Sequence, residues 1–184
     1  ITTGASDPEG VLLRVLGWLN ASDLRMDVLA MPGFDFVHRD ELNRLKQNLR
    51  PNIRVGDFDL AGLFSSRLAV CAFGVTAYEL VFAGVPVVTL GHIRQNDLAA
   101  EILEARHGCV RHLGLHTEVP GEVFLSCIST MWERDSVDRE RAQQAQQNLI
   151  DGKGMDRLMD VIIGLRERSG QSGVSLNTSG GLHE

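Results

Sequence analysis

The sequence predicts an α/β fold with a doubly wound, Rossmann-like parallel sheet of about six strands, followed by extra C-terminal helices. Short apolar runs alternate with helical patterns up to residue 112, and the patterns beyond residue 117 are wholly helical. Strands that alternate with helices pack as a parallel sheet covered by helices on both faces. The expected strands are 1–3, 25–31, 52–55, 68–72, 85–90 and 109–112.

The helices expected between these strands lie at 8–20, 38–49, 60–66, 76–83 and 95–106. Three more are expected at 118–133, 136–150 and 155–167. Residues 1–168 contain no linker or internal repeat, so we expect one domain. Residues 169–184 are rich in Ser and Gly and lack periodicity, which predicts a disordered tail.

Composition limits the possible classes of function. The net charge of −6 over 184 residues argues against a nucleic-acid-binding surface, which would be basic. No apolar run approaches the roughly 18 residues of a transmembrane helix, so no membrane span is expected. Cys71, Cys109 and Cys127 show no metal-ligand spacing, which favours reduced thiols and a cytoplasmic location. The chain opens on what reads as a strand end without a preceding Met, so we expect a fragment with an upstream portion.

Six strands alternating with helices suggest the order 3-2-1-4-5-6, in which ligands bind between the ends of strands 1 and 4. The loops after these strands are "TGASDPEG" and "FGVTAYE". Both open helices, and a helix N-terminus with nearby glycines is a ready anion site. A phosphate site is therefore expected where the two loops converge.

Each loop also has a purely structural interpretation. Ser6 with Glu9, and Thr76 with Glu79, fit the S/T-x-x-E capping box. A third loop, "TLGHIRQND", offers neutral donors and acceptors suited to sugar hydroxyls, but Asn96 and its neighbours could simply begin the next helix. Capping and ligand binding therefore remain open for these loops.

The three loops together resemble the C-terminal, nucleotide-sugar-binding half of GT-B-fold proteins. The segments that carry the resemblance are "GASDPEG", "FDLAGLFSSRLAVCAFGVTAYELVFAGVPVVTL" and "RQNDLA". The match covers about residues 1–112 and is nearest to the nucleotide-sugar hydrolase of pseudaminic acid synthesis and the SpsG-like spore-coat-polysaccharide proteins. The lipid II-forming N-acetylglucosaminyltransferase is a more distant relative.

The resemblance implies a role for each matching position. Backbone amides around Gly4–Ser6 and Gly74–Thr76 would hold the pyrophosphate, Glu79 would bind the ribose, and residues 56–58 would pack against the base. Gln95, with His92 nearby, would face the sugar. The implied nucleotide-sugar-binding residues are Gly4, Ala5, Ser6, Phe58, Gly74, Val75, Thr76, Glu79, His92, Gln95 and Asn96.

The function expected from the resemblance is donor binding in a glycosyltransferase that makes a cell-surface polysaccharide or glycoconjugate. The donor would be UDP-linked, with no cofactor and no metal. The catalytic base and the acceptor site would belong to an N-terminal GT-B domain that this chain does not contain, so no catalytic residue is assigned. A nucleotide-sugar hydrolase is one alternative. A non-catalytic binding module is another, favoured by Ala5, Arg67 and Arg94, which depart from the family pattern.

Overall fold

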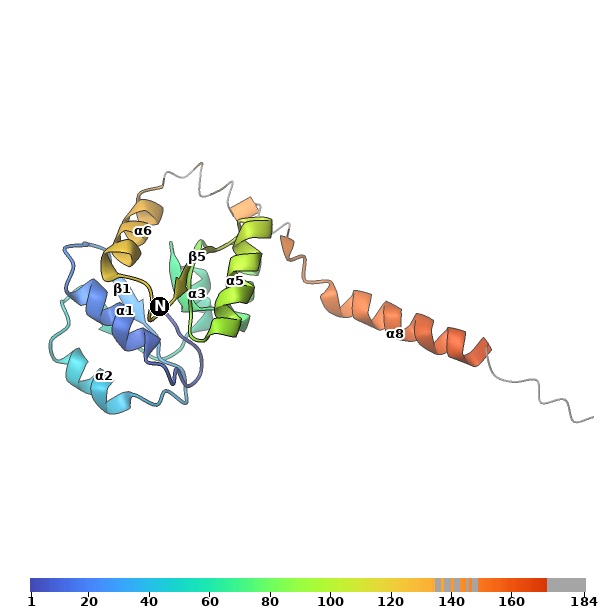
Figure 1. The fold of residues 1–184 in the computed structure, drawn as a ribbon, viewed down its shortest axis with the longest axis horizontal. Helices are drawn as coiled ribbons and strands as arrows, with labels where there is room; N and C mark the ends of the chain where they lie inside the picture. The colour runs from blue at the N-terminus through green and yellow to red at the C-terminus, as the bar shows by residue number, and fades with distance from the viewer. Residues whose placement is uncertain (135–136, 138–139, 141–142, 145, 147–148, 172–184) are drawn as a thin grey trace, which may run out of the picture. The chain divides into compact units, whose positions relative to one another are not determined.

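The computed structural model describes residues 1–134, 137, 140, 143–144, 146 and 149–171. These residues belong to two compact units, Ile1–Ile150 and a second unit that begins at Asp151. The first unit is an α/β structure (Figure 1), and the described part of the second is the helix α8 (Gly154–Gln171). In the described part of the chain, none of the helices has the length and apolar character needed to cross a bilayer.

The strands of the first unit are all parallel. β1 (Val28–Ala30) pairs with β2 (Ile53–Val55), and β4 (Val87–Gly91) lies between β3 (Ala69–Ala72) and β5 (Arg111–Leu115). The pairing between β4 and β5 shifts register between Thr89 and Gly91.

The N-terminal segment joins these two groups of strands. The Ile1 carbonyl oxygen accepts a hydrogen bond from the Met31 amide at 2.8 Å, and the Thr2 amide donates to the Val70 carbonyl oxygen at 3.0 Å. Thr2 also forms a parallel bridge with Cys71. The spatial order is therefore β2, β1, residues 1–3, β3, β4, β5. This confirms the predicted order 3-2-1-4-5-6, although residues 1–3 form only an isolated bridge rather than a full strand.

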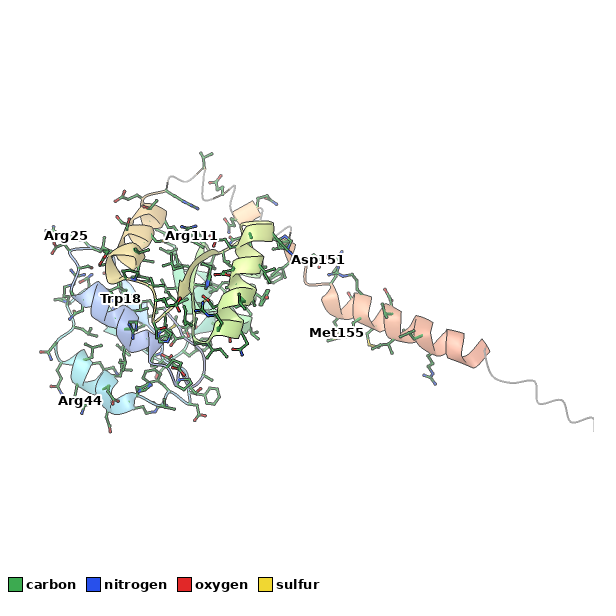
Figure 2. The ribbon with its side chains drawn as sticks, viewed as in Figure 1. Trp18, Arg25, Arg44, Arg111, Asp151 and Met155 are labelled. Carbon is green, nitrogen blue, oxygen red and sulfur yellow. The ribbon has the colours of Figure 1, made fainter. Side chains whose placement is uncertain are left out.

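The helices of the first unit cover both faces of the sheet. The α1 and α6 helices lie on one side of it and α5 on the other (Figure 1). Trp18 of α1 stacks obliquely on Phe124 of α6, with ring centroids 5.1 Å apart, and Figure 2 shows it between these two helices. Over residues 1–134, which the structure describes without a gap, the helices are α1 (Val11–Asn20), α2 (Arg39–Lys46), α3 (Leu60–Phe64), α4 (Val75–Ala83), α5 (Arg94–His107) and α6 (Gly121–Glu133).

Two apolar cores result from the alternation of side chains along the strands. In β3, Val70 packs into a core with α1 and α6, whereas its neighbours Ala69 and Cys71 pack into a second core with α3, α4 and α5. All four residues of β3 and all five of β4 are buried, as expected for strands covered on both faces.

The structure corrects several boundaries predicted from sequence. The first helix begins at Val11 rather than residue 8, because Gly10 adopts the left-handed conformation just before it. The last helix continues to Gln171, so residues 169–171 are helical and not part of a tail. The remainder of the predicted tail, 172–184, lies outside the described residues, as does much of the predicted helix 136–150.

Candidate functional site

A cleft of about 590 Å³ opens where the strand order reverses. It lies at the carboxyl ends of residues 1–3, β1 and β2 and extends to Thr76 of α4 beside the reversal, the position at which doubly wound sheets bind ligands. The structure brings four of the residues predicted for the site into this cleft: Gly4, Ala5, Phe58 and Thr76. The complete lining is Thr2, Gly4, Ala5, Pro32, Gly33, Phe34, Arg39, Asp57, Phe58 and Thr76.

The turn after residues 1–3 presents backbone donors to solvent. Gly4 and Ala5 are exposed, and Gly4 has a φ of 95°, a conformation that glycine adopts without steric cost. The carbonyl oxygens of Ala5 and Ser6 accept hydrogen bonds from the amides of Asp35 and Val37, each at 3.0 Å. Among the described residues, no acceptor pairs with the amides of Gly4, Ala5 or Ser6. These amides are therefore available to an anion.

The N-terminus of α1 is occupied by a side chain from its own turn. The Asp7 carboxylate, which is buried, accepts hydrogen bonds from the amides of Val11 at 3.0 Å and Leu12 at 2.8 Å, and from the Thr3 hydroxyl at 2.9 Å. The predicted capping box of Ser6 and Glu9 is therefore wrong, because the Asp7 carboxylate already satisfies the first amides of α1. It also balances the positive end of the helix dipole there.

The N-terminus of α4 has no such cap. Gly74 is the residue before the helix, and in the part of the chain that the structure describes no side chain caps the first turn. The predicted box of Thr76 and Glu79 is also wrong, since Thr76 already lies within the helix. Val75 and Thr76 therefore present amides without a partner among the described residues, at the positive end of the α4 dipole.

Glu79 follows Thr76 by three residues and so lies on the same face of α4, one turn from the cleft. It is half-buried, and its carboxylate has no hydrogen-bond partner among the described residues. It is not among the residues that line the cleft. The carboxylate can still accept hydrogen bonds from a ligand that extends along this face.

Sequence reasoning missed the loop after β1, residues 32–37. Gly33 lies so close to the glycine-rich turn that an added Cβ would be 2.2 Å from the Gly4 carbonyl oxygen and 2.3 Å from that of Ala5. This contact places Phe34 and Arg39 at the cleft. The dipeptide Pro32–Gly33 at a strand end was the available signal for a tight turn.

The start of α5 is connected to the end of β3. The Asn96 side-chain amide donates to the Phe73 carbonyl oxygen at 3.0 Å, immediately before Gly74. Asn96 therefore links the third predicted loop to the α4 turn, and this bond uses one of its two N–H donors. Gln95 is exposed and His92 is partly buried, and neither lines the cleft.

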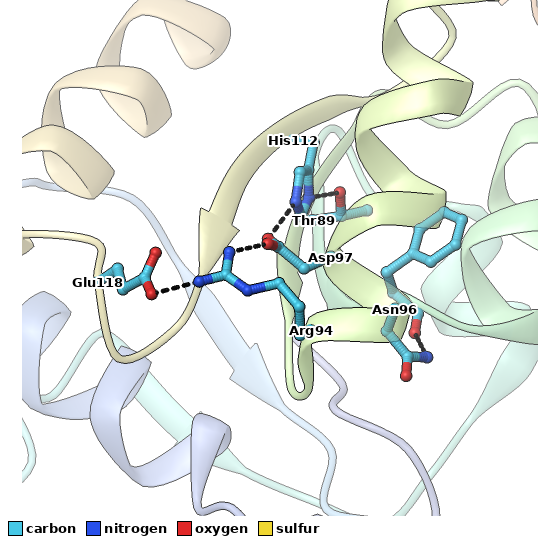
Figure 3. Close-up of polar contacts among 7 residues, drawn as sticks. Thr89, Arg94, Asn96, Asp97, His112 and Glu118 are labelled. Carbon is cyan, nitrogen blue, oxygen red and sulfur yellow. Dashed lines mark hydrogen bonds and ion pairs between the residues drawn. The ribbon is translucent and has the colours of Figure 1, made fainter.

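A buried polar network fixes this start of α5 (Figure 3). The Asp97 carboxylate accepts from Nε2 of His112 at 2.9 Å and from Nη1 of Arg94 at 2.8 Å. Nδ1 of His112 is 2.9 Å from the Thr89 hydroxyl, which connects the network to β4. Nη2 of Arg94 reaches the exposed Glu118 at 2.6 Å. The hydrogen bond to Asp97 and the charge of Glu118 raise the pKa of Arg94.

Two further histidines, His116 and His92, lie close enough together to interact electrostatically. His116 is buried, its amide donates to the Gly91 carbonyl oxygen at 3.0 Å, and it interacts electrostatically with His92. Burial, followed by the charge of Arg14, lowers the pKa of His116, so the neutral imidazole predominates at pH 7. Within the described ranges, no group of three or more His, Cys, Asp and Glu side chains is arranged to hold a metal ion.

Comparison with solved structures relates this architecture to glycosyltransferases. The chain superimposes on the calicheamicin glycosyltransferase CalG4 with a TM-score of 0.63 at 17% identity, covering 89% of this chain and 40% of CalG4. The fold of this chain is therefore of the GT-B type. The chain also matches the glycosyltransferase VinC in complex with dTDP, with a TM-score of 0.64 at 16% identity, covering 91% of this chain and 41% of VinC. For the glycosyltransferase of kitacinnamycin the TM-score is 0.60 at 17% identity, with 88% of this chain and 41% of that protein covered.

Sequence relatives agree with this fold. The chain is 26% identical over 176 residues to the spore coat polysaccharide biosynthesis protein SpsG of Bacillus subtilis (strain 168), covering 91% of this chain and 50% of SpsG. It is 30% identical over 106 residues to the uncharacterized protein MJ1062 of Methanocaldococcus jannaschii, covering 55% of this chain and 21% of that protein. The chain thus spans at most half the length of these relatives. No protein-family model matches it.

Proposed function

We propose that this GT-B domain binds the nucleotide-sugar donor, UDP-linked, of a glycosyltransferase that acts in cell-surface polysaccharide or glycoconjugate synthesis. The pyrophosphate lies against the amides of the Gly4–Ser6 turn and of the α4 N-terminus. Glu79 accepts hydrogen bonds from the ribose hydroxyls, and His92 and Gln95 lie at the sugar end. Acceptor and catalytic base come from a partner GT-B domain.

The observation that carries the proposal is the cleft at the strand-order reversal. It is flanked by two turns, Gly4–Ser6 and Val75–Thr76, whose amides have no acceptor within the described ranges. Because Asp7 neutralises the N-terminus of α1, the uncapped N-terminus of α4 is the stronger anion site of the two helices. Helix N-termini of this kind stabilise a leaving diphosphate electrostatically.

The comparisons support the proposal at a coarser level. VinC was solved with dTDP, a nucleoside diphosphate, and SpsG is described as a polysaccharide biosynthesis protein. The three cysteines are free thiols, which supports a reducing, cytoplasmic setting. The partner domain is supported by the share of each solved glycosyltransferase that this chain leaves uncovered.

Isothermal titration calorimetry with UDP tests the proposal on the chain as given. We expect binding at millimolar concentration or tighter, and a loss of about tenfold in Glu79→Gln, the scale of one charge-assisted hydrogen bond. Because Glu79 makes no cap hydrogen bond, this variant should keep the wild-type melting temperature. Glu101→Gln, on the exposed surface of α5, is the matched control and should bind as the wild type does.

Absence of binding for every nucleoside diphosphate at millimolar concentration would refute the proposal. If Glu79→Gln instead lowers stability and leaves affinity unchanged, the carboxylate is structural and the ribose assignment fails. The hydrolase alternative differs in the acceptor alone, with water in place of a sugar hydroxyl. Release of UDP from a UDP-sugar by the two-domain protein without any acceptor would favour it.

A further inference from the structure

The loop after β1 forms a wall of the cleft to which the family resemblance assigned no role. This loop is attached to the Gly4–Ser6 turn by the close approach of Gly33 and by two backbone hydrogen bonds, which the amides of Asp35 and Val37 donate. The position of Phe34 is therefore determined by the same contacts that shape the proposed pyrophosphate site.

Two aromatic rings from different loops line this one cleft. Phe34 is 84% exposed and Phe58 is 48% exposed. Phenylalanine is normally buried, because covering its apolar ring is favourable. Two uncovered rings in a concave, largely preformed site indicate a ligand with a flat apolar surface.

The cleft also contains one cationic and one anionic side chain. Arg39 donates through Nη2 to the Phe34 carbonyl oxygen, and its guanidinium retains further donors. The exposed Asp57 carboxylate, which accepts hydrogen bonds only, has no partner among the described residues. Both residues also line an adjoining pocket of about 290 Å³, so the polar edge continues beyond the rings.

We propose that Phe34, Arg39 and Asp57 complete the nucleobase end of the site and select bases that carry a ring N–H beside a carbonyl. The rings of Phe34 and Phe58 cover the base, Asp57 accepts from its ring N–H, and Arg39 donates to its carbonyl oxygen. Uracil and guanine have this edge. Cytosine and adenine place a lone pair at the same ring nitrogen, where the Asp57 carboxylate would repel it. This inference rests on the proposed nucleotide-sugar function and extends it to base selection.

Calorimetric titration with UDP, GDP, CDP and ADP tests the selection directly. We expect UDP and GDP to bind about tenfold more tightly than CDP and ADP, the scale of one lost hydrogen bond with a charged partner. In Asp57→Asn the difference should fall below about threefold, since an amide both donates and accepts. Asp35→Asn removes a charge from the neighbouring loop outside the cleft and should keep the wild-type preference.

The stacking surface has a separate test. Phe34→Ala should weaken all four nucleotides by a similar factor of about ten, the size of one lost base–aromatic contact. Val37→Ala, an exposed apolar residue of the same loop that does not line the cleft, is its control. Phe34→Ala and Val37→Ala both keep the backbone contacts that attach the loop after β1 to the Gly4–Ser6 turn.

The outcomes separate this inference from the proposed function. If UDP binds but Asp57→Asn leaves the preference between UDP and CDP unchanged, or Phe34→Ala binds normally, base selection lies elsewhere and only this inference fails. If CDP or ADP binds most tightly, the base selection is also wrong. If none of the four nucleotides binds, the proposed function falls and this inference with it.

Discussion

Replacing Asp7 by Asn tests how the structure begins α1. The Asp7 side chain is 2% exposed and accepts three hydrogen bonds, from the amides of Val11 and Leu12 and the hydroxyl of Thr3. The residue has a φ of 44°, a left-handed conformation that Asn tolerates well. The substitution therefore changes the acceptors without adding backbone strain.

The expected loss follows from the positions of the two carboxylate oxygens. Oδ1 lies 3.0 Å from the Val11 amide and Oδ2 lies 2.8 Å from the Leu12 amide, so both oxygens are needed. An Asn side chain has one oxygen, and one buried helix amide loses its partner at a cost of about 1–3 kcal/mol. Removing the negative charge from the helix N-terminus costs about 0.3–1 kcal/mol more. We expect the free energy of unfolding to fall by about 1.3–4 kcal/mol.

Urea titration followed by tryptophan fluorescence measures this change. Trp18 lies on α1 and contacts Phe124, so its emission reports on the packing of this helix. Ser6→Ala and Glu9→Gln, the residues of the capping box expected from sequence, are the controls and should each change the free energy by about 0.5 kcal/mol or less. A loss below about 0.5 kcal/mol in Asp7→Asn, or an equal loss in Ser6→Ala, would refute the assignment of Asp7 as the cap.

Two further predictions concern buried polar groups. Asp97→Ala should lower the free energy of unfolding by about 3 kcal/mol, because it leaves Nε2 of the buried His112 without its partner. Glu118→Gln, at the exposed end of the network, should cost less than about 1 kcal/mol. Equal losses for the two variants in urea titrations would contradict this network. The pKa of His116 is lowered from 6.5 by burial and by the charges of Arg14 and His92, while Glu9 and Asp7 act in the opposite direction. As the pH falls, the unfolded chain therefore takes up this proton before the folded protein does. The free energy of unfolding should therefore decrease from pH 7 to about pH 5. His116→Gln should flatten this pH dependence, whereas the control His107→Gln, at the exposed end of α5, should not. An unchanged pH dependence in His116→Gln would contradict this prediction.

Local sequence patterns were enough to predict the layered architecture. Strand–helix alternation indicated the parallel sheet, and the predicted strand order agrees with the hydrogen bonds of Ile1, Thr2 and Met31. The family motifs located the turns at Gly4 and Thr76, which the structure brings into one cleft. Such features depend on periodicity and on turn chemistry, which act over a few neighbouring residues.

The identity of the caps could not be predicted from the same patterns. Both S/T-x-x-E motifs are present, but neither forms a capping box. Asp7 replaces Ser6 as the cap because its carboxylate is buried beneath the turn, where it also meets Thr3. A motif states which bonds are possible, and the conformation of the surrounding turn decides which are made.

The sequence alone determined the parallel sheet, its covering helices and the two turns that flank the reversal of strand order, because each is specified by nearby residues. Tertiary structure alone decided the remaining wall of the cleft. The contact of Gly33 with Gly4 and Ala5, which places Phe34 and Arg39 there, joins residues about 30 positions apart. Contacts between residues so far apart in sequence depend on how the strands pair. Strand pairing brings together side chains that no local sequence pattern relates.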